Sequence, residues 1–251
     1  IVASLAEEGL YDGSERTLYR ILEARHALVS RTESRKPGAY RKPQELVATG
    51  PDQVYSWDIT WLKTNVSGIF LCAYVVIDIF SRSIVGWSVE ENESPDHAKT
   101  LFARLIRDRK VTPRFVHADN GGPMKGLTLV AFLTQLQVGM SYSRPRVSDD
   151  NPFIESFFRT VKYHVGYPKV FTGIIGAREW FADFIQRYNT SHRHSGIGYV
   201  TPHQKHTGQD ILLFERRQAT LNAAASRNPE RFVRGARTVA PERPVRLNKA
   251  S

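Results

Sequence analysis

Three acidic residues could, if the fold brings them together, hold two divalent cations and support phosphodiester chemistry. They are Asp58 in YSWDITW, Asp119 in FVHADNGGPM and Glu155 in SDDNPFIESFFRTVK, with 60 residues between the first two and 35 between the last two. Carboxylate oxygens are the ligands that Mg²⁺ and Mn²⁺ prefer, and these ions keep positions open for water and phosphate. Two such ions about 3.5 to 4 Å apart can activate a nucleophilic oxygen and stabilise the leaving oxygen of an in-line displacement. The three residues therefore predict a two-metal phosphodiester site, provided that the fold brings them together.

Each of the three is expected on a different element. The run VYSWDITW alternates between polar and apolar residues, which predicts a strand with Asp58 on its more polar face. Asp119 lies where the short strand RFVHA gives way to NGGP, a position at which α/β sheets present ligands. Glu155 is expected in the first turn of a helix with Asn151 as N-cap and Pro152 at the first helical position.

The remaining periodicities predict a layered α/β core over residues 51–214. IFLCAYVVI is apolar throughout, as in a strand covered on both faces, and the turn DIFSRS leads into IVGWSVE, so residues 54–90 are expected to form an antiparallel meander of three strands. Helices are expected over PDHAKTLFARLIRDRK, LTLVAFLTQL and AREWFADFIQRYNT, with a further strand over VGMSYS. This alternation of strands and helices is typical of α/β proteins.

The helix of Glu155 is expected to have two distinct faces. Its apolar stripe consists of Ile154, Phe157, Val161 and Val165. Glu155, Arg159 and Lys162 fall at i, i+4 and i+7 and share one polar stripe. Positive charge there would meet a DNA phosphate that approaches the metal site. The alternatives are a solvated pair of Glu155 with Arg159 and an ordinary surface lysine at position 162.

Both ends of the chain are predicted to be appendages. Residues 1–29 are predicted to be helical, with Asp12 and Glu15 as a capping-box-like start, and they form either the end of a helix-turn-helix that carries Arg16 and Arg20 or a plain packing helix. Residues 30–50 are predicted to be a basic linker, with five Lys or Arg against two Glu. Residues 215–251 carry nine Lys or Arg against three acidic residues and are predicted to be a basic C-terminal extension or a solvated disordered terminus.

Composition points to a polyanionic partner. The net charge is +10 and the sequence pI is near 9.8, which favours nucleic acid over the alternative of a merely basic enzyme. Cys72, the only cysteine, is expected to be a buried thiol, which fits a reducing cytoplasmic setting. The sequence has no run of 18 apolar residues and no G-x-x-x-x-G-K-[ST] motif, so neither a membrane partner nor a nucleotide cofactor is expected. Because the chain starts at Ile1, we expect it to be a fragment.

Five segments together resemble one protein family. WDIT, VVIDIFSRSIVGW, HADNG, SRPRVSDDNPFIESFFRTVKY and YNTSHRHSGIGYVTP match, in order, the integrase-core D,D(35)E transposases of bacterial insertion sequences. More narrowly, residues 10–215 resemble the downstream-frame protein of the insertion-sequence-three family. The resemblance implies a ribonuclease-H-like fold, that of a retroviral-integrase catalytic core, with a mixed five-stranded sheet flanked by helices. It also implies that Asp58, Asp119 and Glu155 hold two Mg²⁺ ions, for which Mn²⁺ can substitute.

Basic and histidine side chains near these segments are expected to contact DNA. The resemblance assigns Lys162 to the end of the element, and the further candidates are Arg159, Arg144, Arg146, His192, Arg193, His194, Arg16 and Arg20. The cluster of His192, His194, His203 and His206 invites a zinc site, but without cysteines DNA contact or structural hydrogen bonds are favoured.

Two further polar residues have open roles. Asp78 is expected to be a turn-capping acceptor rather than a third metal ligand. His117 either lines the site or is a satisfied core histidine.

The function expected from these features is that of a DNA transposase. It would hydrolyse a phosphodiester at an element end and use the freed 3′-OH for strand transfer. Expected partners are terminal inverted repeats, target DNA, further copies of the chain and an upstream-frame protein. The alternatives are a retroviral-type integrase or a nuclease on the same fold, and an inactive domesticated DNA-binding protein.

Overall fold

The computed structural model describes residues 2–11, 13–25, 43–144, 150–240 and 244–248 of the 251-residue chain. Asp12, Arg146 and most of the expected linker lie outside these ranges. Within the described residues, no helix has the length and apolar character needed to cross a membrane.

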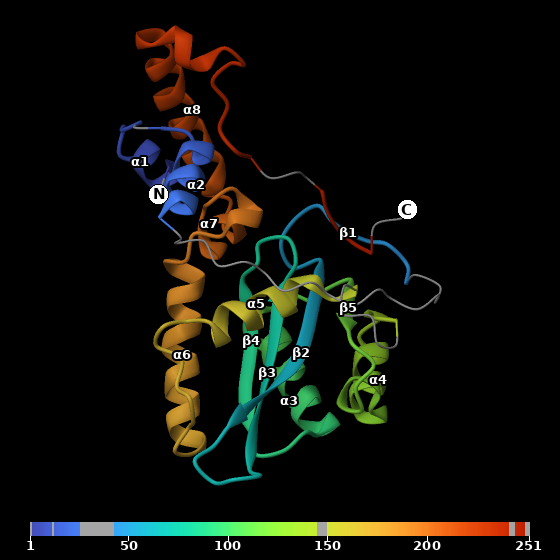
Figure 1. Ribbon diagram of the computed structural model, residues 1–251. Helices are drawn as coiled ribbons and strands as arrows, with labels where there is room; N and C mark the ends of the chain where they lie inside the picture. Colours follow the sequence, from blue (N-terminus) through green and yellow to red (C-terminus); the bar gives the residue numbers. More distant parts are fainter. Residues whose placement is uncertain (1, 12, 26–42, 145–149, 241–243, 249–251) are drawn as a thin grey trace.

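The centre of the molecule is a mixed five-stranded sheet in the order β4-β3-β2-β5-β6 (Figure 1). Its strands are β2 (Val54–Lys63), β3 (Phe70–Asp78), β4 (Ile84–Glu90), β5 (Phe115–Ala118) and β6 (Gly139–Tyr142). The first three form the predicted antiparallel meander, and β5 and β6 continue from β2 in parallel. All five strands predicted from the sequence pattern are confirmed.

Helices cover both faces of this sheet. One face packs against α3 (Pro95–Arg109), η1 (Pro123–Lys125) and α4 (Leu127–Gln135), and the other against α5 (Pro152–Lys162) and α6 (Ile174–Thr190). Strand β3 is apolar up to Ile77 because its alternate residues enter both cores: Val75 and Ile77 contribute to one, Tyr74 and Val76 to the other. Full burial of each such side chain is worth about 1.5–3 kcal/mol.

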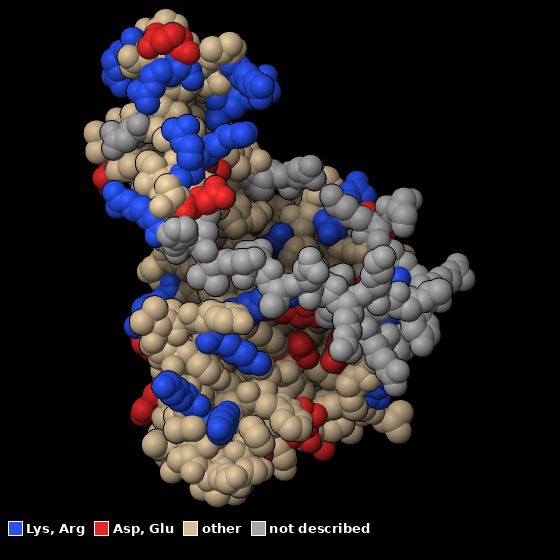
Figure 2. Space-filling view, viewed as in Figure 1, with Lys and Arg blue, Asp and Glu red and all other residues tan. Residues whose placement is uncertain are grey.

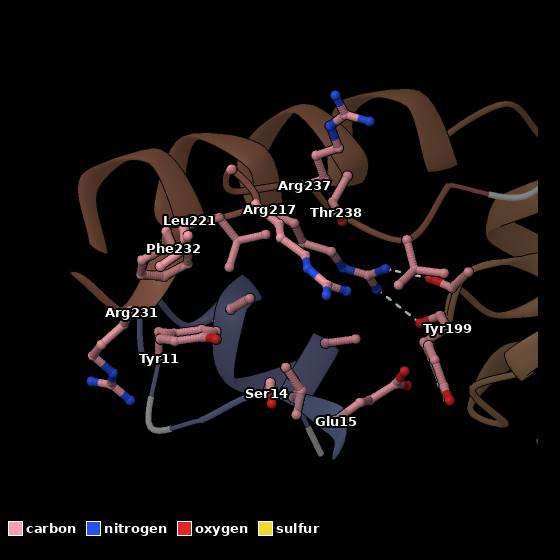
Figure 3. Close-up of a pocket in the computed structure, with 18 residues that line it drawn as sticks. Tyr11, Ser14, Glu15, Tyr199, Arg217, Leu221, Arg231, Phe232, Arg237 and Thr238 are labelled. Atoms are coloured by element: carbon pink, nitrogen blue, oxygen red, sulfur yellow. Dashed lines mark hydrogen bonds between the residues drawn. The ribbon is translucent and has the colours of Figure 1, made fainter. Parts of the chain in front are cut away.

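A helical arm extends from this core, and in it helices near the N-terminus pack beside a helix from the C-terminal part of the chain (Figure 1). It contains α1 (Val2–Glu7), α2 (Glu15–Ala24), α7 (Pro202–His206), α8 (Asp210–Arg227) and the 3-10 turns η3 (Ser195–Ile197) and η4 (Pro229–Phe232). Arg217 of α8 is 2% exposed and donates hydrogen bonds to Glu7 of α1 and, at 2.8 Å, to the carbonyl of Tyr199. The arm contains an open pocket of about 470 Å³ between α1, α2, α8 and residues 231–239 (Figure 3).

The structure differs from the sequence predictions at the ends of several elements. Ser14, rather than Asp12, is the N-cap of α2 and accepts from the Thr17 amide. Helix α5 ends at Lys162, so Val165 is fully exposed instead of joining the buried stripe, and Phe158 is buried in its place.

The predicted appendages also contain regular structure. Leu46–Ala48 (β1), inside the expected linker, pairs antiparallel with Val245–Leu247 (β7), inside the expected basic extension. The expected boundary at residue 215 falls within α8. Local composition could not reveal this pairing because the two strands lie about 200 residues apart in the sequence.

Candidate active site

The strand pairing brings two of the three acidic residues level with each other. In the parallel pair of β2 and β5, Ser56 lies opposite His117. Continuing that register by two residues places Asp58 opposite Asp119, just past the end of β5. Ser56 contacts Asn151 at the start of α5, and side chains alternate along a strand, so Asp58 faces the same helix. Glu155 lies in the first turn of that helix.

The electrostatic state of Asp58 links it to both other carboxylates. Burial, followed by the negative charges of Asp119, Glu155 and Glu93, raises the pKa of Asp58 to about 7. A hydrogen bond from the Ile59 amide opposes this shift. The three residues from β2, the end of β5 and α5 therefore form one electrostatically coupled group.

The donor chemistry of this group fits divalent cations, although its side chains are not gathered around one point. Among the described residues, no group of three or more His, Cys, Asp or Glu is arranged to hold a metal ion. The carboxylate of Asp58 accepts from the Ile59 amide at 2.7 Å and that of Asp119 from the Gly121 amide at 2.8 Å. A carboxylate has two oxygens, so each can keep its backbone bond while the other oxygen binds an ion. A nearby cation would offset the charge repulsion on Asp58.

The start of α5 is fixed by two polar contacts. Arg144 donates to Asp150 through its Nε and Nη2 atoms, both at 2.9 Å, and Asp150 is almost fully buried. Asn151 occupies the predicted N-cap position but makes no side-chain cap bond. Its amide instead accepts from the Ser56 hydroxyl and donates to the Trp57 carbonyl at 3.4 Å. The sequence did not predict this link between α5 and β2. An asparagine just before a helix is already explained as an N-cap, so its residue type gave no sign of a second role.

His117 is a core histidine. Its side chain is fully buried and its two ring nitrogens contact the hydroxyls of Ser141 at 3.0 Å and Ser143 at 3.2 Å. Burial lowers the pKa of His117 to about 4, so the ring is neutral at pH 7. The structure therefore supports the second of the two roles considered for this residue.

Asp78 has the predicted role of a turn acceptor. It is fully buried, and its carboxylate accepts from the amide of Ser81 at 2.9 Å and from the amide of Asp52 at 3.2 Å. His206 of α7 lies 3.5 Å from Asp78 and 3.3 Å from Asp52. These contacts attach α7 to the sheet at the turn between β3 and β4.

The histidine cluster does not form a zinc site in the described residues. His206 turns toward Asp52 and Asp78, whereas His192 stacks on Tyr188 with ring centroids 5.1 Å apart. His194 caps η3 by accepting from the Gly196 amide.

The His206 contacts predict a loss of stability at alkaline pH. Burial opposes protonation of His206, but hydrogen bonds and charge contacts with Asp52 and Asp78 outweigh it and raise the pKa to about 9. This pKa exceeds the value of about 6.5 in the unfolded chain, so protonated His206 stabilises the folded state. The stabilisation is complete below pH 6.5 and is lost as pH rises through 9. Urea unfolding of the wild type relative to His206→Gln should show an advantage of about 1–2 kcal/mol at pH 6, after discounting for solvent screening. That advantage should shrink by pH 9.5, and an advantage that stays constant would contradict the assigned contacts.

The structure separates the residues expected to contact DNA. Arg159 and Lys162 are exposed on α5, the helix of Glu155, whereas Arg16 and Arg20 are exposed on α2 in the arm. Figure 2 shows acidic side chains gathered beside the sheet where α5 crosses it, and basic side chains crowded on the arm around α8.

The other candidates within the described residues are engaged within the protein. Arg144 is paired with Asp150, and Arg193 lies 2.5 Å from Glu7. Burial lowers the pKa of His192, and it lowers that of His194 to about 4, with a smaller contribution from nearby positive charge.

Comparison with known proteins agrees with this arrangement. Two models described as integrase core domain match the chain, over residues 48–148 and 136–202. The transposase for insertion sequence element IS904 of Lactococcus lactis is 30% identical over 196 residues, which cover 77% of this chain and 74% of that protein. Transposase InsF for insertion sequence IS3A of Escherichia coli is 31% identical over 163 residues, covering 64% of this chain but only 56% of InsF.

A solved structure supports the fold. A chain of the simian T-cell lymphotropic virus intasome, in complex with PP2A regulatory subunit B56 gamma, superposes with a TM-score of 0.54. The match is 18% identical and covers 82% of this chain and 74% of that chain. The predicted fold, with its mixed five-stranded sheet and flanking helices, is therefore confirmed.

Proposed function

We propose that this chain, which belongs to the integrase-core transposases of bacterial insertion sequences, uses Asp58, Asp119 and Glu155 to cut and join DNA. The observation that carries the proposal is the state of Asp58. Burial and the charges of Asp119 and Glu155 keep its pKa near 7, so the three residues act on one another although they come from three separate elements. Such clustering of perturbed acidic groups is typical of catalytic sites.

Asp58, Asp119 and Glu155 would hold the divalent cations, Mg²⁺ or Mn²⁺. When bound, these ions would supply Lewis acidity to the attacking and leaving oxygens of the phosphodiester. The contribution of the chain itself is to fix the carboxylates on rigid elements. Asp58 lies within β2, Asp119 directly after β5, and Glu155 on α5, whose buried face packs against the sheet.

The reaction would proceed in two displacements. In the first, water attacks a phosphodiester at the end of the element, a phosphorus–oxygen bond breaks and a 3′-OH is released. In the second, that hydroxyl oxygen attacks another phosphodiester, forms a new phosphorus–oxygen bond and displaces another 3′-OH. The number of phosphodiester bonds is unchanged in the second step, so no nucleotide cofactor is required.

Positive charge beside the carboxylates would orient the DNA. Arg159 and Lys162 lie one and two turns beyond Glu155, and both are exposed. Contacts of this kind to phosphates position a duplex without reading its sequence. Arg16 and Arg20 of the arm are proposed as a separate DNA contact. Terminal inverted repeats, target DNA, further copies of the chain and an upstream-frame protein are the proposed partners.

An assay of end cleavage and joining tests this function. Labelled duplexes would carry an end of the insertion sequence that encodes this chain, either intact or already cut to expose the 3′-OH. With Mg²⁺, the wild type should cut the first and join the second to another duplex. Glu155→Gln should lower both rates by about 10²–10³-fold or more, because it removes a proposed ligand of the ions that would stabilise charge in the transition state.

Glu93→Gln is the matched control, since Glu93 also raises the pKa of Asp58 but lies outside the proposed ligand set. This variant should keep both activities. Cleavage to water without joining would indicate a nuclease, and a wild type without metal-dependent nicking would indicate an inactive DNA-binding protein. Joining that survives Glu155→Gln would overturn the assignment of the site.

A further inference from the structure

The junction between β2 and α5 depends on one buried amide. Asn151 is 3% exposed and precedes the first residue of α5. Its side-chain oxygen accepts from the hydroxyl of Ser56, which is fully buried, and its nitrogen donates to the backbone carbonyl of Trp57 at 3.4 Å. Asn151 therefore connects the helix to the two strand residues that directly precede Asp58.

The same residue also begins the hydrogen bonding of the helix. The amide of Glu155 donates to the backbone carbonyl of Asn151 at 3.3 Å, which closes the first turn of α5. A continuous path of hydrogen bonds thus runs from the strand beside Asp58, through Asn151, to the backbone of Glu155. Glu155 lies four positions after Asn151, a rise of about 6 Å along the helix axis.

Because the Asn151 side chain contacts β2, it does not cap the helix. Asparagine is among the preferred N-caps, and an N-cap side chain is worth about 0.5–2 kcal/mol to a helix. In α5 no side-chain cap bond forms. The neighbouring pair of Arg144 and Asp150 already anchors the residue before Asn151. Anchoring alone therefore does not require Asn151 to reach β2.

We infer that Asn151 is a positioning residue that sets Glu155 relative to Asp58 for cation binding, an inference that rests on the proposed function. An amide suits this position because it can both accept from the Ser56 hydroxyl and donate to the Trp57 carbonyl. An ionised aspartate could only accept, and it would add negative charge beside Asp58.

The test measures Mn²⁺ binding to the DNA-free protein by electron paramagnetic resonance, besides DNA cleavage. Asn151→Ala and Asn151→Asp should each weaken Mn²⁺ binding by about 10–100-fold, the range typical of groups that orient metal ligands. Cleavage should require correspondingly more Mn²⁺, with a smaller change in the rate at saturation. Ser56→Ala removes only the hydroxyl contact and should give a smaller loss in the same direction, which keeps the inference testable if the Asn151 variants fold poorly.

Asn189 provides a matched control at another helix-to-strand junction. Its side chain bridges the backbone of Ile84 in β4, accepting at 2.9 Å and donating at 2.9 Å. Asn189→Ala removes the same kind of bridge from α6 and should leave Mn²⁺ affinity unchanged. An equal loss of affinity in both variants would reduce the role of Asn151 to general stability and overturn the inference.

A double-mutant cycle with Glu155→Gln isolates the path through Glu155. If Asn151 acts by positioning this carboxylate, Asn151→Ala should weaken Mn²⁺ binding little further once Glu155 is neutral. A full and additive loss would contradict the inference.

The proposed function fails separately, when the wild type shows no metal-dependent cleavage. Normal Mn²⁺ affinity and cleavage in Asn151→Ala would leave the proposed function intact and reject only the positioning role.

Discussion

Replacing Asp58 with asparagine is expected to abolish DNA cleavage and joining, and also to stabilise the protein when divalent ions are absent. The first effect follows from the loss of a proposed cation ligand and should exceed about 10³-fold. The second follows because the wild-type carboxylate is partly buried among the charges of Asp119, Glu155 and Glu93. The asparagine oxygen can still accept from the Ile59 amide, so the local backbone contact is preserved.

Thermal unfolding in EDTA and in Mg²⁺ checks the expected gain. In EDTA at pH 8, Asp58→Asn should unfold at a higher temperature than the wild type, with a gain of about 1–2 kcal/mol after discounting for solvent screening. Mg²⁺ should stabilise the wild type and have little effect on the variant, because ligand binding to the folded state raises stability. An Asp58→Asn variant that is less stable than the wild type in EDTA would argue against charge repulsion between Asp58 and its acidic neighbours.

Replacing Asp210 with alanine is expected to destabilise the protein by about 3–5 kcal/mol, because it breaks a buried ion pair by removing one partner. Lys205 of α7 and Asp210 of α8 form an ion pair at 2.7 Å, and each side chain is 1% exposed. The ammonium of Lys205 also lies 4.8 Å from the centre of the Phe80 ring, next to the turn between β3 and β4. The pair thereby joins the arm to the sheet.

Urea unfolding at pH 7 measures this effect against two comparisons. The double variant Lys205→Met with Asp210→Leu should recover most of the lost stability, because apolar side chains often replace a buried ion pair without loss. Asp183→Ala should cost less than about 1 kcal/mol, since its pair with Arg187 is half exposed to solvent. A small cost for Asp210→Ala, similar to that of Asp183→Ala, would mean that this ion pair does not stabilise the junction.

The elements of the core could be predicted from the sequence because a buried strand or helix face requires apolar residues at a regular spacing along the chain. Alternation in VYSWDITW identified β2 and the face of Asp58, and the apolar run of β3 reflects the two cores that it separates. The helical spacing of Ala98, Leu101 and Leu105 likewise marks the buried face of α3.

Contacts between polar groups that are distant in the sequence produce no such regular spacing. Asn151 matched the pattern of an N-cap, yet its side chain binds a strand 94 residues earlier in the chain. Arg144 fitted the pattern of a DNA contact, but it pairs with Asp150. Residue types at these positions were therefore informative, whereas the partner of each side chain depended on the folded arrangement.

The pairing of β1 with β7 has a consequence for how the protein is made. Synthesis proceeds from the N-terminus, so Leu46 and Ala48 leave the ribosome long before Leu247 exists to complete their apolar cluster with Val54 and Ile79. Contacts between such distant residues also form slowly, because a long loop must close first. The two-stranded sheet can therefore form only after residue 247 has been synthesised. A chain that ends earlier would lack Leu247 and leave the apolar side chains of this cluster less covered, an exposure that promotes aggregation.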